Sequence, residues 1–202
     1  MRKRSSVLAA LAAAAAVLAA PAAAPAAAGT QAAGPSGTSA TRTFTFRGMT
    51  LKIPSGWKVH RQKDYAVVVT GACGYPEPFL PGCEGFWVFG GKAITKVPVG
   101  GGYVTYTGES QFHPFSGVIQ CPFDAEEQWN AADRRVSAGL RQVGRGHRAK
   151  YSAWGNTCVT PSGRKTRSFT QREWYLPSSK ILVVDVWNTP GLAKALRNAA
   201  WR

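Results

Sequence analysis

The sequence predicts an α+β fold: a curved, mostly antiparallel sheet with two or three flanking helices and two disulfides. Three observations support this prediction. Stretches of alternating apolar and polar residues recur from residue 42 to residue 187, with Gly and Pro between them. Two other segments have the composition and spacing of helices. The chain also contains four cysteines, an even number, as expected for paired half-cystines in an exported protein.

The first part of the chain contains strand-like segments. Phe44 and Phe46 alternate with polar residues, and residues 65–70 (YAVVVT) form a β-branched run typical of a buried strand. A turn is predicted at residues 100–102 (GGG). We predict strands at residues 42–47, 49–53, 57–59, 65–70, 86–89, 93–97, 103–107 and 118–121.

The second part of the chain contains both predicted helices. Residues 125–134 (AEEQWNAADR) are good helix formers, and Asp124 is a suitable N-cap. Residues 136–143, 149–157 and 166–176 are predicted to form a meander of strands, and residues 181–187 (ILVVDVW) are the strongest strand signal. A final helix at 191–200 is expected, with Thr189 as N-cap and a proline at its first position.

The N-terminal segment has the features of a secretory signal peptide. Residues 2–4 are basic, residues 7–20 are apolar, and small-x-small patterns end at Ala24 and Ala28. We prefer cleavage after Ala28 over cleavage after Ala24 and therefore predict a leader at residues 1–28. The apolar run is shorter than the roughly 20 residues of a membrane-spanning helix. Residues 29–41 are small and polar, as in a flexible linker. Residues 42–202 are predicted to form a single secreted domain.

The cysteines are predicted to form two disulfides. Three pairings are open for four cysteines, and we prefer Cys73–Cys83 and Cys121–Cys158. The first of these would close a proline-rich loop. No C-x-x-C or H-x-x-x-H spacing is present, so no metal site is predicted, and no cofactor motif of the phosphate-loop type occurs.

Basic residues are concentrated in one part of the sequence. The formal charge is +15, and it is +12 without the three basic residues at positions 2–4. Residues 134–172 contain ten Lys or Arg and no Asp or Glu. If the strands of this region are neighbours, they present a basic face that attracts anionic polymers. The predicted anion-binding residues are Arg141, Arg145, Arg148, Lys150, Arg164, Lys165, Arg167 and Arg172.

Catalysis has little support in the sequence. No nucleophile elbow and no zinc-binding helix motif is present. Glu173, expected in a surface cleft, and His147 supply the residue types of a base and an acid for a small secreted nuclease, but no nuclease motif accompanies them. Asp185 interrupts an apolar strand, so we expect it to be buried beside an arginine.

Three patterns resemble secreted actinobacterial proteins of unknown function. They are FTFRGMTLKIPSGW at 44–57, VGxxHRAKYSAWxxxC at 143–158 and ILVVDVWxTPGLxxxLxxAxW at 181–201. The two ends of the chain also resemble PsbP-like folds. That second resemblance implies a curved antiparallel sheet with flanking helices and a binding or scaffolding role, and it transfers no catalytic residues.

These observations favour a secreted, non-catalytic domain that binds an anionic cell-envelope polymer through its basic face. Nucleic acid is an alternative partner. Two other hypotheses stay open: a secreted hydrolase of an anionic substrate, nuclease first, and a protein-interaction module.

Overall fold

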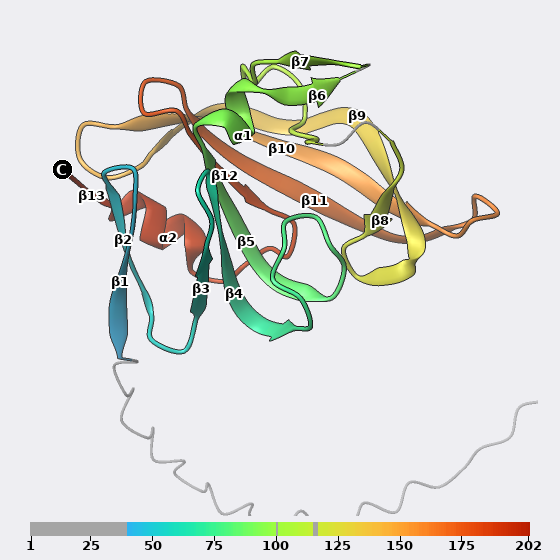
Figure 1. The fold of residues 1–202 in the computed structure, drawn as a ribbon, viewed down its shortest axis with the longest axis horizontal. Helices are drawn as coiled ribbons and strands as arrows, with labels where there is room; N and C mark the ends of the chain where they lie inside the picture. Colours follow the sequence, from blue (N-terminus) through green and yellow to red (C-terminus); the bar gives the residue numbers. More distant parts are fainter. Residues whose placement is uncertain (1–39, 100, 115–116) are drawn as a thin grey trace, which may run out of the picture. The chain divides into compact units, whose positions relative to one another are not determined.

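The computed structural model describes residues 40–99, 101–114 and 117–202 (Figure 1). The predicted leader at 1–28 lies outside the described residues, as does the predicted linker up to residue 39. The last residue of that linker, Thr41, already belongs to the first strand.

The largest element is an eight-stranded sheet in which every neighbouring pair of strands is antiparallel. Its long strands β9, β10 and β11 curl across the molecule (Figure 1). The strand order is β3 (Lys58–Arg61), β4 (Tyr65–Cys73), β5 (Cys83–Gly90), β12 (Ile181–Asp185), β11 (Lys165–Leu176), β10 (Arg148–Val159), β9 (Asp124–Gln142) and β8 (Ile119–Cys121).

Smaller elements accompany the main sheet. One sheet contains β1 (Thr41–Phe46), β2 (Met49–Pro54) and β13 (Ala200–Trp201), and another pairs β6 (Val97–Val99) with β7 (Gly102–Val104). The helices of the described residues are α1 (Lys92–Thr95) and α2 (Leu192–Arg197).

The main sheet is buried on both faces at its centre, because each face carries its own hydrophobic core. Alternate residues of β12 point to opposite faces. Val183 packs with β1, β2 and α2, whereas Leu182 and Val184 pack on the other side with Phe79 and Phe112. Burial on both faces explains why residues 181–185 are apolar without alternation.

The predicted α+β class is wrong, because the described residues form thirteen strands and only two short helices. The predicted helix at 125–134 lies within β9 instead. Asp124 is the first residue of this strand and caps no helix, although its carboxylate accepts the Glu126 N–H at 2.9 Å. Trp129 is buried against Phe79 and pairs in register with Cys158 of β10. Tertiary packing therefore overrides the helix propensity of this segment.

Other elements differ less from the prediction. Residues 92–95 form α1, although the β-branched residues at 93–97 suggested a strand. The C-terminal helix is present but spans only Leu192–Arg197. Thr189 does not cap it, because its hydroxyl donates to the Asp185 carboxylate at 3.1 Å. The remaining predicted strands are present, with β7 shorter than expected.

Both preferred disulfides are confirmed: Cys73 pairs with Cys83 and Cys121 pairs with Cys158. The first closes the proline-rich loop that contains Phe79, and Phe79 packs in the core on the Leu182 and Val184 face of the sheet. The second joins β8 to β10 across β9. No helix among the described residues has the length and apolar content needed to cross a membrane.

Candidate functional site

The basic segment of the sequence folds into three adjacent strands. β9, β10 and β11 form consecutive antiparallel pairs, so residues far apart in sequence meet on one face. Tyr151 lies opposite Trp174 in the β10–β11 ladder, and Arg141 lies opposite Ala149 in the β9–β10 ladder. The side chains opposite each other in such ladders share a face of the sheet.

A hollow of about 320 Å³ opens on this face, between the three strands and α2. Three guanidinium groups line it, and each comes from a different element: Arg141 from β9, Arg172 from β11 and Arg197 from α2. The complete lining is Ser137, Arg141, Gln142, Tyr151, Arg172, Trp174, Ala193 and Arg197.

Two of the arginines are held by aromatic rings. The Arg141 guanidinium lies 4.9 Å from the centre of the Tyr151 ring, which packs against Trp174 with ring centres 5.2 Å apart. The Arg172 guanidinium lies 5.5 Å from the Trp174 ring. Cation–π contacts of this kind hold the charged groups in place without neutralising them. The strands therefore present an ordered row of two cations and two aromatic rings.

Asp185 positions Arg172, as the sequence predicted for a buried Asp with an arginine partner. Its carboxylate is fully buried and accepts hydrogen bonds from both Nε and Nη2 of Arg172. Its other oxygen accepts the N–H groups of Trp187 and Thr189 and the Thr189 hydroxyl. Because all of these donors converge on one carboxylate, Arg172 is fixed at the floor of the hollow.

The hollow keeps an excess of positive charge. Among the residues that the structure describes, the ion pairs are Arg172–Asp185, Arg135–Glu109 and Lys150–Glu109. Neither Arg141 nor Arg197 takes part in one, so Arg172 is the one arginine of the hollow that a carboxylate neutralises among the described residues. Arginine donors favour phosphate and carboxylate groups.

Arg197 is the functional candidate that sequence reasoning missed. The spacing of Leu192 and Leu196 identified the buried face of the final helix, and Ala193 and Arg197 lie on a neighbouring face. That spacing shows that Ala193 and Arg197 lie together, but nothing in the sequence shows that their face turns toward β9 and β11.

The other predicted anion-binding residues lie outside the hollow: Arg145, Arg148, Lys150, Arg164, Lys165 and Arg167. Lys150 points to the opposite face of the sheet and pairs with Glu109 at 3.2 Å. Arg164 lies in the β10–β11 turn, and Lys165 is the first residue of β11. Lys165 pairs with Val159, which is eight residues from Tyr151, so the two basic residues are roughly 25 Å from Tyr151 at 3.3 Å per residue. Arg167 covers the Phe123 ring at 4.6 Å. The basic segment therefore divides into several surfaces rather than one continuous face.

Glu173 is not in a surface cleft, so that expectation is wrong: its side chain is fully buried under the 105–114 segment. One carboxylate oxygen accepts the Tyr106 hydroxyl at 2.5 Å and the Trp154 indole N–H at 2.9 Å. The other accepts the Phe112 N–H at 2.7 Å and the Gln171 amide at 2.6 Å. Glu173 thus ties the 105–114 segment to the centre of the sheet.

His147 is not near this carboxylate. Its ring stacks on Trp201 with centres 3.9 Å apart, in the turn before β10. Glu173 lies opposite Ser152, five residues further along the chain, or roughly 15 Å away at strand spacing. The structure does not bring the two residues of the nuclease hypothesis together.

Burial raises the pKa of Glu173 above its ordinary value of 4.5, although its four hydrogen bonds act in the opposite direction. Burial likewise raises the pKa of Tyr106, and the neighbouring Glu173 adds to the effect. Glu173 therefore keeps its proton in the folded protein at pH values where the unfolded chain has released it.

This difference in pKa predicts a pH dependence of stability. As pH rises from the ordinary pKa of Glu173 through its raised value, the unfolded chain binds fewer protons than the folded chain, so stability falls. Glu173→Gln removes this titration. We expect the Tm of Glu173→Gln minus that of the wild type to increase as pH rises above the ordinary pKa of Glu173. Thermal unfolding followed by circular dichroism measures this difference, and a constant value would contradict the prediction.

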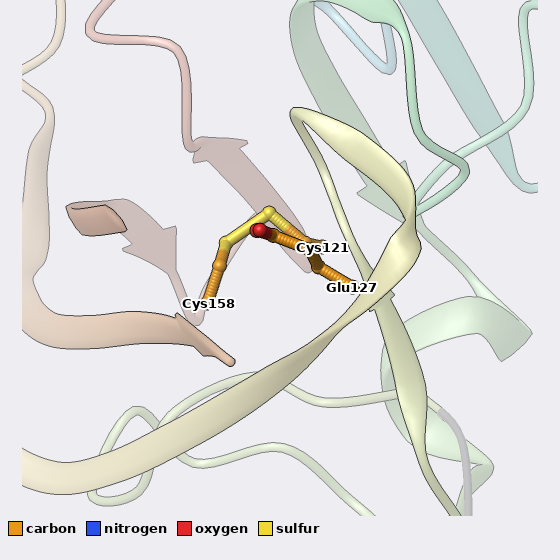
Figure 2. Close-up of side chains that lie close together, drawn as sticks. All are labelled: Cys121, Glu127 and Cys158. Atoms are coloured by element: carbon orange, nitrogen blue, oxygen red, sulfur yellow. A yellow bond between two sulfur atoms is a disulfide. The ribbon is translucent and has the colours of Figure 1, made fainter. Parts of the chain in front are cut away.

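A third cluster contains the Cys121–Cys158 disulfide and Glu127. The two sulfur atoms and a Glu127 carboxylate oxygen lie within 4.8 Å of one another (Figure 2). The sulfurs are bonded to each other, so they are not thiolate ligands. The Glu127 carboxylate accepts the Thr166 hydroxyl at 2.6 Å, which gives it a structural role between β9 and β11.

The fold and the hollow together define an antiparallel β protein with two intrachain disulfides and an arginine-lined surface site. No protein-family model, curated protein sequence or solved structure matches the chain.

Proposed function

We propose that this chain is an exported, non-catalytic domain that binds an anionic polymer of the cell envelope at the arginine-lined hollow. The observation that carries the proposal is the convergence of Arg141, Arg172 and Arg197 from three different elements. The two disulfides support the extracellular setting, where such bonds persist. The predicted leader at residues 1–28 and the resemblance to secreted actinobacterial proteins point the same way and stay predictions.

The chemistry of the hollow suits phosphate or carboxylate groups joined by small polar units. Guanidinium groups offer paired N–H donors that match the oxygens of these anions. A volume of about 320 Å³ is at the lower end of the range for small-molecule sites, so it accommodates one repeat unit rather than a long segment. The remaining basic residues of β9 to β11 would attract the rest of the polymer over a longer range.

The proposal predicts that Arg197→Gln weakens binding of a fluorescently labelled poly(glycerol phosphate) by about tenfold. The substitution removes one guanidinium from an exposed position of α2 and leaves both cores intact. Binding is measured by fluorescence anisotropy over a series of salt concentrations. The slope of log affinity against log salt should also decrease in magnitude by about 1.

Arg164→Gln is the matched control, because it removes the same charge at the distant β10–β11 turn. We expect this variant to retain binding within about twofold of the wild type. Equal losses of polymer affinity in the two variants would mean that the basic surface attracts the polymer without a specific site, and would refute the proposal. Tighter binding to single-stranded DNA than to the polymer at every salt concentration would favour nucleic acid as the partner.

A further inference from the structure

β9 has a free edge over part of its length. On one side it pairs with β10 up to Gln142, but on the other side β8 pairs only with residues near its start: Asp124, Gln128 and Trp129. Apart from β10, no segment in the described part of the chain makes a backbone hydrogen bond to residues 134–142. The opposite edge of the main sheet is β3, which has only four residues.

The register shows which backbone groups face outward. The Val143 N–H donates to the His147 carbonyl at 3.0 Å, so these two residues form a hydrogen-bonded pair at the end of the β9–β10 ladder. Bonded and non-bonded pairs alternate in an antiparallel ladder, and no register shift occurs between residues 137 and 142. The N–H and C=O groups of Ala138, Leu140 and Gln142 therefore point away from β10.

The side chains at this edge form a recognisable surface. Leu140 is 58% exposed, and Val136 of the same strand is 51% exposed. Leu140 borders an open hollow of about 710 Å³, whose other lining residues are Gln142, Gly146, His147 and Arg148. Arg141 lies on the other face of the same stretch. An extended chain beside this edge would have a basic residue near each of its faces.

We propose that the free edge of β9 at residues 137–142 binds an extended acidic peptide, which adds to the main sheet as a further strand. Backbone groups of Ala138, Leu140 and Gln142 supply the hydrogen bonds, as in other strand-addition complexes. At the Leu140 carbonyl the peptide replaces the hydrogen bond that Arg141 Nη1 donates at 3.3 Å. Alternate side chains of the peptide point to the hollow beside Leu140 and to the face of Arg141. Acidic residues on the two faces would pair with Arg148 and Arg141, respectively.

Charge selects this occupant over two others. A second copy pairing along the same edge would bring Arg134 and Arg141 of both chains together, and like charges across a strand pair are unfavourable. The N-terminal segment of this chain, residues 1–39, contains no Asp or Glu and so does not complement the edge. Residues 134–172 likewise contain no acid that would neutralise it.

The test uses an acetylated, amidated octapeptide of alternating Glu and Val, with binding measured by isothermal titration calorimetry on the full chain. Ala138→Pro removes one outward N–H without removing a bond to β10, as proline is tolerated where the N–H faces solvent. We expect this variant to bind about tenfold more weakly. Ala138→Val, which keeps the N–H, should bind within about twofold of the wild type. Equal affinity of the two variants would overturn the proposal.

A pair of modified peptides tests the same point without changing the protein. Each carries N-methyl groups on alternate residues, in one register or in the other, so charge and composition are identical. An affinity difference of about tenfold between the two supports strand addition, and equal affinities overturn it. A Lys and Val peptide binding as tightly as the Glu and Val peptide would also overturn it. A wild-type dimer in sedimentation equilibrium that Ala138→Pro dissociates would assign the edge to a second copy instead.

The test separates the edge from the proposed polymer site, although Arg141 borders both. Arg197→Gln is expected to leave peptide affinity unchanged, and Ala138→Pro is expected to leave polymer affinity unchanged, because Ala138 does not line the hollow that contains Arg197. A loss of peptide binding in Arg197→Gln would contradict a separate edge site.

Discussion

Glu173→Ala is expected to lower the free energy of unfolding by about 4 kcal/mol. The substitution leaves four donors without their acceptor in the interior: the Tyr106 hydroxyl, the Trp154 indole, the Gln171 amide and the Phe112 N–H. An unsatisfied buried donor costs about 1–3 kcal/mol, and the loss of a buried hydrogen-bond network is among the few causes of effects this large. The 105–114 segment should detach from the sheet first, since Glu173 makes two hydrogen bonds to it, one to Tyr106 and one to Phe112.

Urea unfolding followed by tryptophan fluorescence measures this loss. Glu109→Ala is the control, because Glu109 is exposed and its ion pairs with Arg135 and Lys150 lie at the surface. We expect a change within about 0.5 kcal/mol there. Hydrogen exchange should additionally show faster exchange at the Phe112 N–H in Glu173→Ala. Losses of similar size in the two variants would contradict the structural role of Glu173.

Removal of the Cys121–Cys158 disulfide should have an effect of similar size. The two cysteines are 37 residues apart in sequence, and a cross-link over a loop of this length stabilises by about 4 kcal/mol in the chain-entropy model. The bond also holds β8 and β10 on either side of β9. We expect Cys121→Ser/Cys158→Ser to lose about 4 kcal/mol of unfolding free energy, measured by urea unfolding.

The other disulfide provides the comparison. Cys73 and Cys83 are only 10 residues apart, so Cys73→Ser/Cys83→Ser should lose about 3 kcal/mol. A mass increase of four hydrogen atoms on full reduction of the wild type would show that two disulfides are present. A larger loss from the shorter loop would contradict the entropic argument and indicate that the packing of Phe79 dominates there.

Much of the sheet was predictable because strand signals are local. Alternation in residues 42–53 and the apolar run at 181–185 follow directly from which faces are buried. The prediction of a helix at 125–134 was wrong for a specific reason. Its Ala, Glu and Gln residues favour helix in isolation, but a buried Trp129 beside the Cys121–Cys158 disulfide holds it extended.

The candidate site was less predictable than the fold. Arg141 and Arg172 were among the predicted anion-binding residues, but six others from the same group lie elsewhere. Their positions depend on strand parity: neighbouring residues such as Lys150 and Tyr151 point to opposite faces. A one-residue change in register would exchange the residues that face the hollow with those on the opposite face of the sheet. The sequence does not specify the register of a strand as long as β9.

The sequence by itself determined the positions of most strands, the preferred disulfide pairing and the burial of Asp185 beside an arginine. Each of these depends on residue type and on spacing over short distances. Only the tertiary structure decided the almost all-β class, the burial of Glu173 and the meeting of Arg141, Arg172 and Arg197. These features depend on contacts between segments distant in sequence, whose packing energies outweigh local propensity and determine which side chains share a face.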